Sequence, residues 1–274
     1  MPDWETGADA TTITENYARY LVPACFETWA GETLNHAQVR PGSTVLDVAC
    51  GTGVVTFETA PLVGQVGRVV GVDTDSVMLA VAERIRKARG TTNVRFYEMD
   101  AQRLEFVEGT FDHVTCQHAI MFFNDKPATV KEMYRVLAPG GRLVITAWSA
   151  RQHTPHEEML AEAFYAVLGD EHPFFKTLFN LGDRGAMGEV LRLAGLKTHS
   201  IIERVRHNAI FPTAEAYWQG MVYGRPIARF AATLTQEELE AIKSDVFTRM
   251  SPFAANKGFI SPMEAVVATV IKPY

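Results

Sequence analysis

Residues 45–53 constrain the fold of this chain more than any other segment does. The apolar run VLDVA is followed by a loop of small residues, CGTG, and then by a helix-compatible run, VVTFETA. A strand that ends in a glycine turn and opens a helix lets the backbone approach a nucleotide closely. This order predicts an α/β fold that binds a nucleotide-type ligand at the end of a strand.

The same alternation of strand and helix continues through the first half of the chain. Apolar runs predict strands at residues 43–48, 68–72, 94–98, 111–116 and 142–147. The stripe Val77, Val81, Ile85 predicts a helix capped by Thr74 or Asp75, and residues 129–137 predict another. Strands that alternate with helices indicate a parallel sheet with right-handed crossovers.

The second half follows a different pattern. Residues 150–185 have no strand signal and predict a helical insert, followed by a helix at 189–194 and a sixth strand at 198–205. Residues 213–250 predict further helices, and alternating Ala and Val at 265–271 predict a last strand. We therefore expect an N-terminal helical cover (1–40), a ligand-binding core (41–149), and a helical substrate cap with the last two strands (150–274).

Composition excludes several classes of function. The 274 residues are 47% hydrophobic, which allows a large core, and the net charge of −6 disfavours a nucleic-acid partner. Three scattered cysteines argue against a disulfide framework, and the absence of a CxxC pair leaves a structural zinc site without support. No signal peptide and no apolar run of membrane-spanning length is found. We expect a soluble, cytoplasmic protein without a metal; its oligomeric state is not predicted.

The acids around the glycine loop help to choose the ligand. A dinucleotide fingerprint needs Gly or Ala where this chain has Thr56, and Asp47 would repel a pyrophosphate. S-adenosylmethionine has no phosphate and carries an ammonium and a sulfonium, so it favours nearby carboxylates. Asp73 and Asp100 follow the next two strands, where a carboxylate can accept ribose hydroxyls or the adenine amino group.

Five ordered motifs resemble those of class I S-adenosylmethionine-dependent methyltransferases: VLDVACGTG, VVGVD, EMDAQRL, FDHVTCQHAIMFF and EMYRVLAPGGRLVITAW. The resemblance is strongest to the branch of the ubiquinone and menaquinone biosynthesis methyltransferases. It implies a Rossmann-like, doubly wound, seven-stranded sheet whose last strand is antiparallel, with a helical cap. It also implies a set of cofactor contacts: Asp47, Ala49 (commonly glycine in the family), Gly51, Gly53, Asp73, Thr74, Met78, Asp100, Ala101, Gln102 and Gln117. Tyr20, in the N-terminal aromatic segment, is a further candidate because an aromatic face stabilises a sulfonium.

Histidines are the candidate catalytic groups. His118 follows the fourth strand and is the leading candidate for a general base; the alternative is that it only shapes the pocket. His153 and His156 have a spacing that suits a metal or a substrate, although exposed loop histidines are the more frequent explanation.

The sequence therefore predicts S-adenosylmethionine-dependent methyl transfer, which yields S-adenosylhomocysteine, to a small or medium apolar or aromatic molecule. Oxygen or carbon is the expected acceptor atom. One alternative is a non-methylating enzyme, such as a cyclase, that uses the cofactor structurally or electrostatically. A dinucleotide-dependent oxidoreductase is a weaker alternative.

Overall fold

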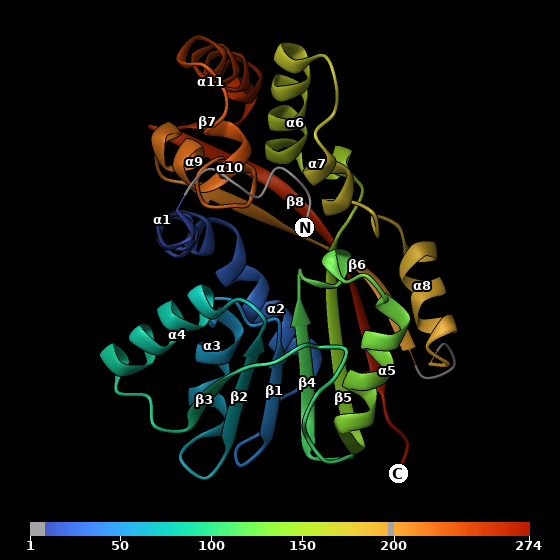
Figure 1. Cartoon of the computed structure of the whole chain (residues 1–274). Helices are drawn as coiled ribbons and strands as arrows, with labels where there is room; N and C mark the ends of the chain where they lie inside the picture. The colour runs from blue at the N-terminus through green and yellow to red at the C-terminus, as the bar shows by residue number, and fades with distance from the viewer. Residues whose placement is uncertain (1–8, 197–199) are drawn as a thin grey trace. The chain divides into compact units, whose positions relative to one another are not determined.

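The computed structural model describes residues 9–196 and 200–274 (Figure 1). The chain divides into two compact units. The core unit comprises Glu27–Trp148, Leu181–Val205 and Ala265–Tyr274. The helical unit comprises the N-terminal segment that ends at Phe26, together with Ser149–Asn180 and Arg206–Glu264. The chain passes from one unit to the other several times, including within two long strands.

The sheet has the strand order β3-β2-β1-β4-β5-β8-β6, with the short β7 paired to β8. Its strands are β1 (Thr44–Val48), β2 (Arg68–Asp73), β3 (Val94–Glu98), β4 (Phe111–Gln117), β5 (Leu137–Trp148), β6 (Ser200–Phe211), β7 (Ala254–Ala255) and β8 (Gly258–Ile271). The pairings among β1 to β5 are parallel, and β8 is antiparallel to β5. The predicted doubly wound sheet with an antiparallel strand beside the fifth is confirmed.

Helices of the core unit pack on the sheet because its strands are apolar and need cover. They are α2 (Glu27–Ala37), α3 (Val54–Val63), α4 (Ser76–Arg89), α5 (Lys126–Val136) and α8 (Arg184–Leu193), with the short η3 (Ile120–Phe122) after β4. α2 packs on α3, and α5 packs on α8. Right-handed crossovers that reverse direction at β1 and β4 place α3 and α5 on opposite faces. A valine cluster of Val45, Val63, Val69 and Val94 fills the core under α3.

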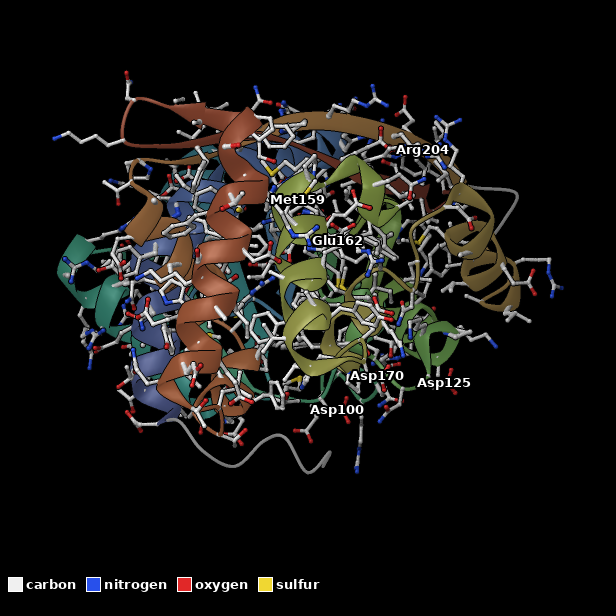
Figure 2. All side chains as sticks on the ribbon, turned by 90° about the horizontal axis from the view of Figure 1, so that it is seen from above. Asp100, Asp125, Met159, Glu162, Asp170 and Arg204 are labelled. Carbon is white, nitrogen blue, oxygen red and sulfur yellow. The ribbon has the colours of Figure 1, made fainter. Side chains whose placement is uncertain are left out.

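The helical unit contains α1 (Ala10–Asn16), the π-helical segment η2 (Tyr17–Phe26), α6 (Pro155–Leu168), α7 (Pro173–Leu178), α9 (Ala214–Met221), α10 (Ile227–Ala231) and α11 (Gln236–Met250). The short turns η4 (Arg151–His153) and η6 (Ser251–Phe253) also belong to it. Figure 2 shows α6 and α11 side by side, and Arg249 of α11 donates to Glu162 of α6 at 2.5 Å. None of the helices described is long and apolar enough to cross a membrane.

Several predicted boundaries were wrong, some because of a local cap and others because of long-range strand pairing. α5 begins at Lys126, before the predicted start at residue 129, because Asp125 accepts from the Ala128 amide and caps the helix. β5 begins at Leu137 and not at residue 142, since residues 138–141 belong to the strand and the Gly140 amide donates to the Lys272 carbonyl. β6 and β8 are longer than predicted, and α8 begins earlier, at a cap formed by Asp183. The predicted start of the sixth strand, residue 198, lies outside the described residues.

Candidate functional site

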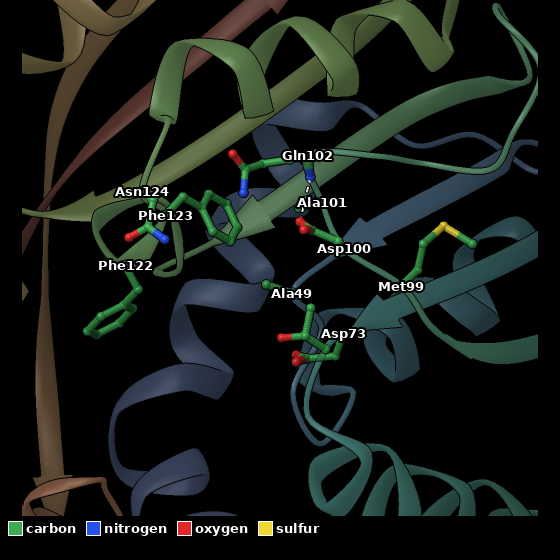
Figure 3. A pocket seen from close by; sticks show the side chains of 10 residues that line it. Ala49, Asp73, Met99, Asp100, Ala101, Gln102, Phe122, Phe123 and Asn124 are labelled. Atoms are coloured by element: carbon green, nitrogen blue, oxygen red, sulfur yellow. Dashed lines mark hydrogen bonds between the residues drawn. The ribbon is translucent and has the colours of Figure 1, made fainter. Parts of the chain in front are cut away.

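A cavity of about 210 Å³ opens at the carboxyl ends of β1, β2 and β3 in the core unit (Figure 3). Ligands of open parallel sheets bind at this edge, which is where the sequence predicted the site. The loops after the three strands supply most of the wall, and residues 122–124 complete it. The lining residues are Ala49, Asp73, Thr74, Met99, Asp100, Ala101, Gln102, Phe122, Phe123 and Asn124.

The glycine loop turns sharply between β1 and α3. Gly51 and Gly53 have φ angles of +55° and +88°, in the left-handed region that glycine adopts most readily. A Cβ atom at Gly53 would lie only 2.8 Å from the Phe57 ring. Ala49 also has a positive φ, +54°, a conformation that glycine adopts more readily than alanine does.

The Asp73 carboxylate joins this loop to the end of β2. One oxygen accepts from the Gly51 amide at 2.8 Å, and the other accepts from the Asp75 amide at 2.9 Å. Asp75, the alternative to Thr74 in the sequence prediction, caps α4 by accepting from the amides of residues 77 and 78. Burial raises the pKa of Asp73, although hydrogen bonds from the Asp75 and Gly51 amides lower it in part. A carboxylate offers about four acceptor sites, so Asp73 keeps acceptor capacity for a ligand donor beside these backbone hydrogen bonds.

Asp47 lies inside the sheet and does not line the cavity. Its carboxylate is 2% exposed and accepts from the hydroxyls of Thr56 at 2.6 Å and Thr115 at 3.0 Å. Burial raises the pKa of Asp47 to about 6, and the two hydroxyls oppose that rise. An ionised carboxylate at this buried position carries a cost in desolvation.

Asp100 lines the cavity after the end of β3. It follows β3 by two residues and accepts from the Gln102 amide at 2.8 Å, which closes a tight turn around Ala101. Asp100 is exposed, whereas Ala101 is buried. Figure 3 shows the Asp100 carboxylate beside Gln102, with the hydrogen bond between them drawn as a dashed line.

His118 is packed between two tryptophans. Its ring stacks on Trp148 with centroids 4.0 Å apart and meets the Trp29 ring edge-on at 5.3 Å. The residue has a φ of +50°, and its amide donates to Thr146. Burial lowers the pKa of the imidazole to about 3, so the ring is neutral at pH 7. These are the contacts of a packed ring, and the catalytic role of His118 stays a prediction.

Comparison with known protein families identifies the family of this chain. The model of the ubiE/COQ5 methyltransferase family matches residues 22–179. The chain belongs to that family. A ubiquinone/menaquinone biosynthesis C-methyltransferase from Cellvibrio japonicus is 38% identical over 137 residues, which are 50% of this chain and 53% of the relative. The chain thus spans about half the length of the curated relatives it matches.

Solved structures share the fold of this family member. Phosphoethanolamine N-methyltransferase 2 of Haemonchus contortus, solved with S-adenosyl-L-methionine, has a TM-score of 0.60 at 22% identity, covering 97% of this chain and 58% of its own. The [4+2]-cyclase SpnF has a TM-score of 0.56 at 20% identity, covering 90% and 81%. At these identities the likeness shows the fold and leaves the chemistry open.

The cavity brings together half of the predicted cofactor residues. Those that line it are Ala49, Asp73, Thr74, Asp100, Ala101 and Gln102. Gly51 and Asp47 lie behind this wall, in the contacts given above. Gln117 accepts from Thr33 of α2 at 2.9 Å, and Met78 lies in the first turn of α4. Tyr20 belongs to the helical unit.

Sequence reasoning missed several residues of the site. Met99 and Asn124 line the cavity together with Phe122 and Phe123, and none of the four was predicted as a cofactor contact. Thr56 was treated as the missing third glycine of a dinucleotide loop, yet its hydroxyl fixes Asp47. A threonine at the third position of α3, facing back toward an aspartate in the preceding strand, is the signal that identifies this contact.

The two insert histidines do not behave as exposed loop residues. His156 is fully buried in α6, near Ser261 Oγ, and burial lowers its pKa to about 3. The expectation of exposure was wrong for His156 because α6 begins at Pro155 and turns this face inward. His153 is partly exposed and contacts Glu264. Within residues 9–196 and 200–274, no group of three or more His, Cys, Asp or Glu side chains is arranged to hold a metal.

Proposed function

We propose that the core unit binds S-adenosylmethionine and that the protein transfers its methyl group to a small molecule. One observation carries this proposal: among the described residues that line the cavity, Asp73 and Asp100 are charged and no lysine or arginine is present. An anionic cavity repels a pyrophosphate and attracts a cofactor that carries an ammonium and a sulfonium. Membership of a methyltransferase family supports the same ligand.

The residues fit the parts of this cofactor. Asp73, with Thr74 and Met78 beside it, is assigned to the ribose hydroxyls, because its oxygens keep acceptor capacity. The turn at Asp100, Ala101 and Gln102 is assigned to the adenine. The methionine part is assigned to Asp47, Ala49, Gly51, Gly53 and Gln117, with Tyr20 as a further contact.

The bound cofactor supplies a methyl group that its sulfonium already activates. The protein then has to orient the acceptor in line with that group and exclude water, which lowers the barrier by roughly 7–11 kcal/mol. A base is required where the acceptor atom carries a proton that it must lose. His118 remains a candidate for this step.

We further propose a small, apolar, aromatic acceptor, bound with the help of the helical unit. The relatives are named C-methyltransferases of ubiquinone and menaquinone biosynthesis, which favours a hydroxylated ring and transfer to carbon. Transfer to oxygen is the alternative. Buried aromatic rings from α6, α7 and α9 support an apolar environment: Phe164, Phe174, Phe175, Tyr217 and Trp218.

Titration calorimetry with S-adenosylmethionine and S-adenosylhomocysteine tests the cofactor site. Asp73→Asn should weaken binding by about tenfold or more, because hydrogen bonds to a charged group contribute about 1.5–3 kcal/mol. Asp75→Asn is the matched control, since asparagine caps a helix as well as aspartate does. Equal affinity in wild type and Asp73→Asn would refute the assignment.

Product analysis separates methyl transfer from the cyclase alternative. A methyltransferase releases one S-adenosylhomocysteine for each acceptor converted, whereas an enzyme that uses the cofactor structurally converts its substrate without consuming it. Hydroxylated aromatic compounds are the first acceptors to assay. Conversion of an acceptor without release of S-adenosylhomocysteine would overturn the proposal of methyl transfer.

A further inference from the structure

A buried carboxylate organises three donors within the helical unit. Glu264 Oε1 accepts from Ser149 Oγ at 2.6 Å and contacts His153 Nδ1 at 2.7 Å. Glu264 Oε2 accepts from Arg206 Nε at 2.6 Å. The Glu264 side chain is 3% exposed, whereas His153 is 30% exposed. We call these four residues the Glu264 cluster.

The cluster fixes the orientation and tautomer of the His153 ring. Burial raises the pKa of Glu264, but the three donors outweigh burial and lower it overall, so the carboxylate is ionised at pH 7. An ionised carboxylate can only accept, and Nδ1 therefore carries the proton in this contact. In the neutral imidazole, Nε2 is then an acceptor. Among the residues that the structure describes, none hydrogen-bonds to Nε2.

We propose that His153 and Glu264 form a base dyad that removes the proton from an acidic hydroxyl, of the phenol class, on a molecule bound to the helical unit. This inference rests on the proposed function and names its acceptor chemistry. The O–H bond of the phenol breaks, the proton goes to His153 Nε2, and the electron pair stays on the oxygen. The phenolate is then the nucleophile: its oxygen or an activated ring carbon forms the new bond to the methyl carbon. The bond between that carbon and the sulfonium sulfur breaks at the same time, and its electron pair stays on the sulfur.

The geometry gives His153 what a base needs and His118 lacks. A carboxylate that holds Nδ1–H orients the ring and stabilises the imidazolium that forms when Nε2 takes a proton. The partial exposure of the His153 side chain leaves a route for a ligand to Nε2. His118 is enclosed between two indole rings, and its buried site opposes the charged form.

4-Nitrophenol is a direct probe, because its phenolate absorbs at longer wavelength than the phenol. The protein, saturated with S-adenosylhomocysteine, is titrated with 4-nitrophenol at a pH where the free phenol stays protonated. The wild type should produce the phenolate band. His153→Gln should reduce the bound phenolate at least about tenfold, in line with the size of acid–base contributions. Glu264→Gln, which keeps an acceptor but loses the charge, should give an intermediate band.

His207→Gln is the matched control, because His207 is another partly buried histidine of the helical unit. The inference is overturned if the wild type gives no phenolate band, or if His153→Gln gives the same band as the wild type. Calorimetry with S-adenosylhomocysteine on the same samples keeps the two proposals apart. Intact cofactor binding without a band refutes the dyad alone, whereas loss of cofactor binding in the wild type refutes the proposed function.

Discussion

The buried carboxylate of Asp47 should lower the stability of the protein at neutral pH, and Asp47→Asn should raise it. Burial moves the pKa of Asp47 from 3.8 to about 6, a rise of about two units. Each unit corresponds to about 1.36 kcal/mol, so ionised Asp47 costs about 3 kcal/mol at pH 7. In the asparagine variant the Thr56 or Thr115 hydroxyl must reorient, and this offsets about 1 kcal/mol of the gain in unfolding free energy. The expected net gain in unfolding free energy is about 2 kcal/mol.

The pH dependence identifies the cause. Because the pKa is higher in the folded state, the folded protein binds the extra proton between about pH 4 and pH 6. The stability from this group is therefore present below pH 4 and is lost as the pH rises through 6. The advantage of Asp47→Asn over the wild type should be about 1.4 kcal/mol larger at pH 7 than at pH 5.

Urea unfolding of both proteins at the two pH values measures this difference. Asp112→Asn is the matched control, since Asp112 is exposed and accepts from a backbone amide, that of Thr44. If Asp47→Asn is no more stable than the wild type at pH 7, or its advantage does not change with pH, the reasoning is wrong. Under the proposed function the same variant should bind S-adenosylmethionine more weakly, a trade of stability for function.

Three further changes test other parts of the structure. Gly53→Ala should lower the unfolding free energy by about 1–3 kcal/mol, because its backbone is left-handed and the new Cβ meets the Phe57 ring. Gly51→Ala should lower it by about 1 kcal/mol, because its backbone is also left-handed but the space around it is open; urea unfolding measures both. Arg225→Met should lower the unfolding free energy by about 3–5 kcal/mol, because Glu157 stays buried without its ion-pair partner at 2.6 Å. The double variant with Glu157→Gln should recover part of this loss, as thermal and urea unfolding can measure. His118→Phe should keep the stacking but make the stability less sensitive to acid. Between pH 7 and pH 5 the unfolding free energy of the wild type should fall by about 2 kcal/mol relative to that of the variant. The reason is that the histidine takes up a proton near pH 6.5 in the unfolded chain, but only at about pH 3 when it is buried. If His118 is also the base, this variant should lose turnover and keep its affinity for S-adenosylhomocysteine; full turnover would leave it a packing residue.

Much of the fold was predictable because the core unit repeats a local pattern. Each strand is a short apolar run, and helix ends carry their own signals, such as the Asp75 cap of α4 and Gly90 at its end. Asp73 and Asp100 could be placed at one edge because the carboxyl ends of parallel strands meet there. Boundaries failed where long-range pairing extends a strand, as in β8, whose first residues, GFISPM, do not alternate between apolar and polar in the sequence.

The division of the chain could not be read from local patterns. β6 and β8 each contribute to both units, so the unit boundaries fall inside continuous strands rather than in linkers. The burial of His156 depends on the start of α6 and on Ser261, about a hundred residues away. A histidine beside prolines looks like a loop residue until the elements that cover it are known.

The sequence by itself determined the strand, the glycine turn and the acids at the strand ends, because backbone propensity and strand order are local properties. Tertiary structure decided what each acid does. Asp47 and Asp73 look alike in the chain, yet Asp47 is enclosed by hydroxyls from α3 and β4, while Asp73 faces a cavity and holds the glycine loop through Gly51. The two hydroxyl partners of Asp47 lie nine and 68 residues away, and Gly51 lies 22 residues from Asp73. Desolvation and hydrogen bonding, which set the charge of a carboxylate, act through space and not along the chain.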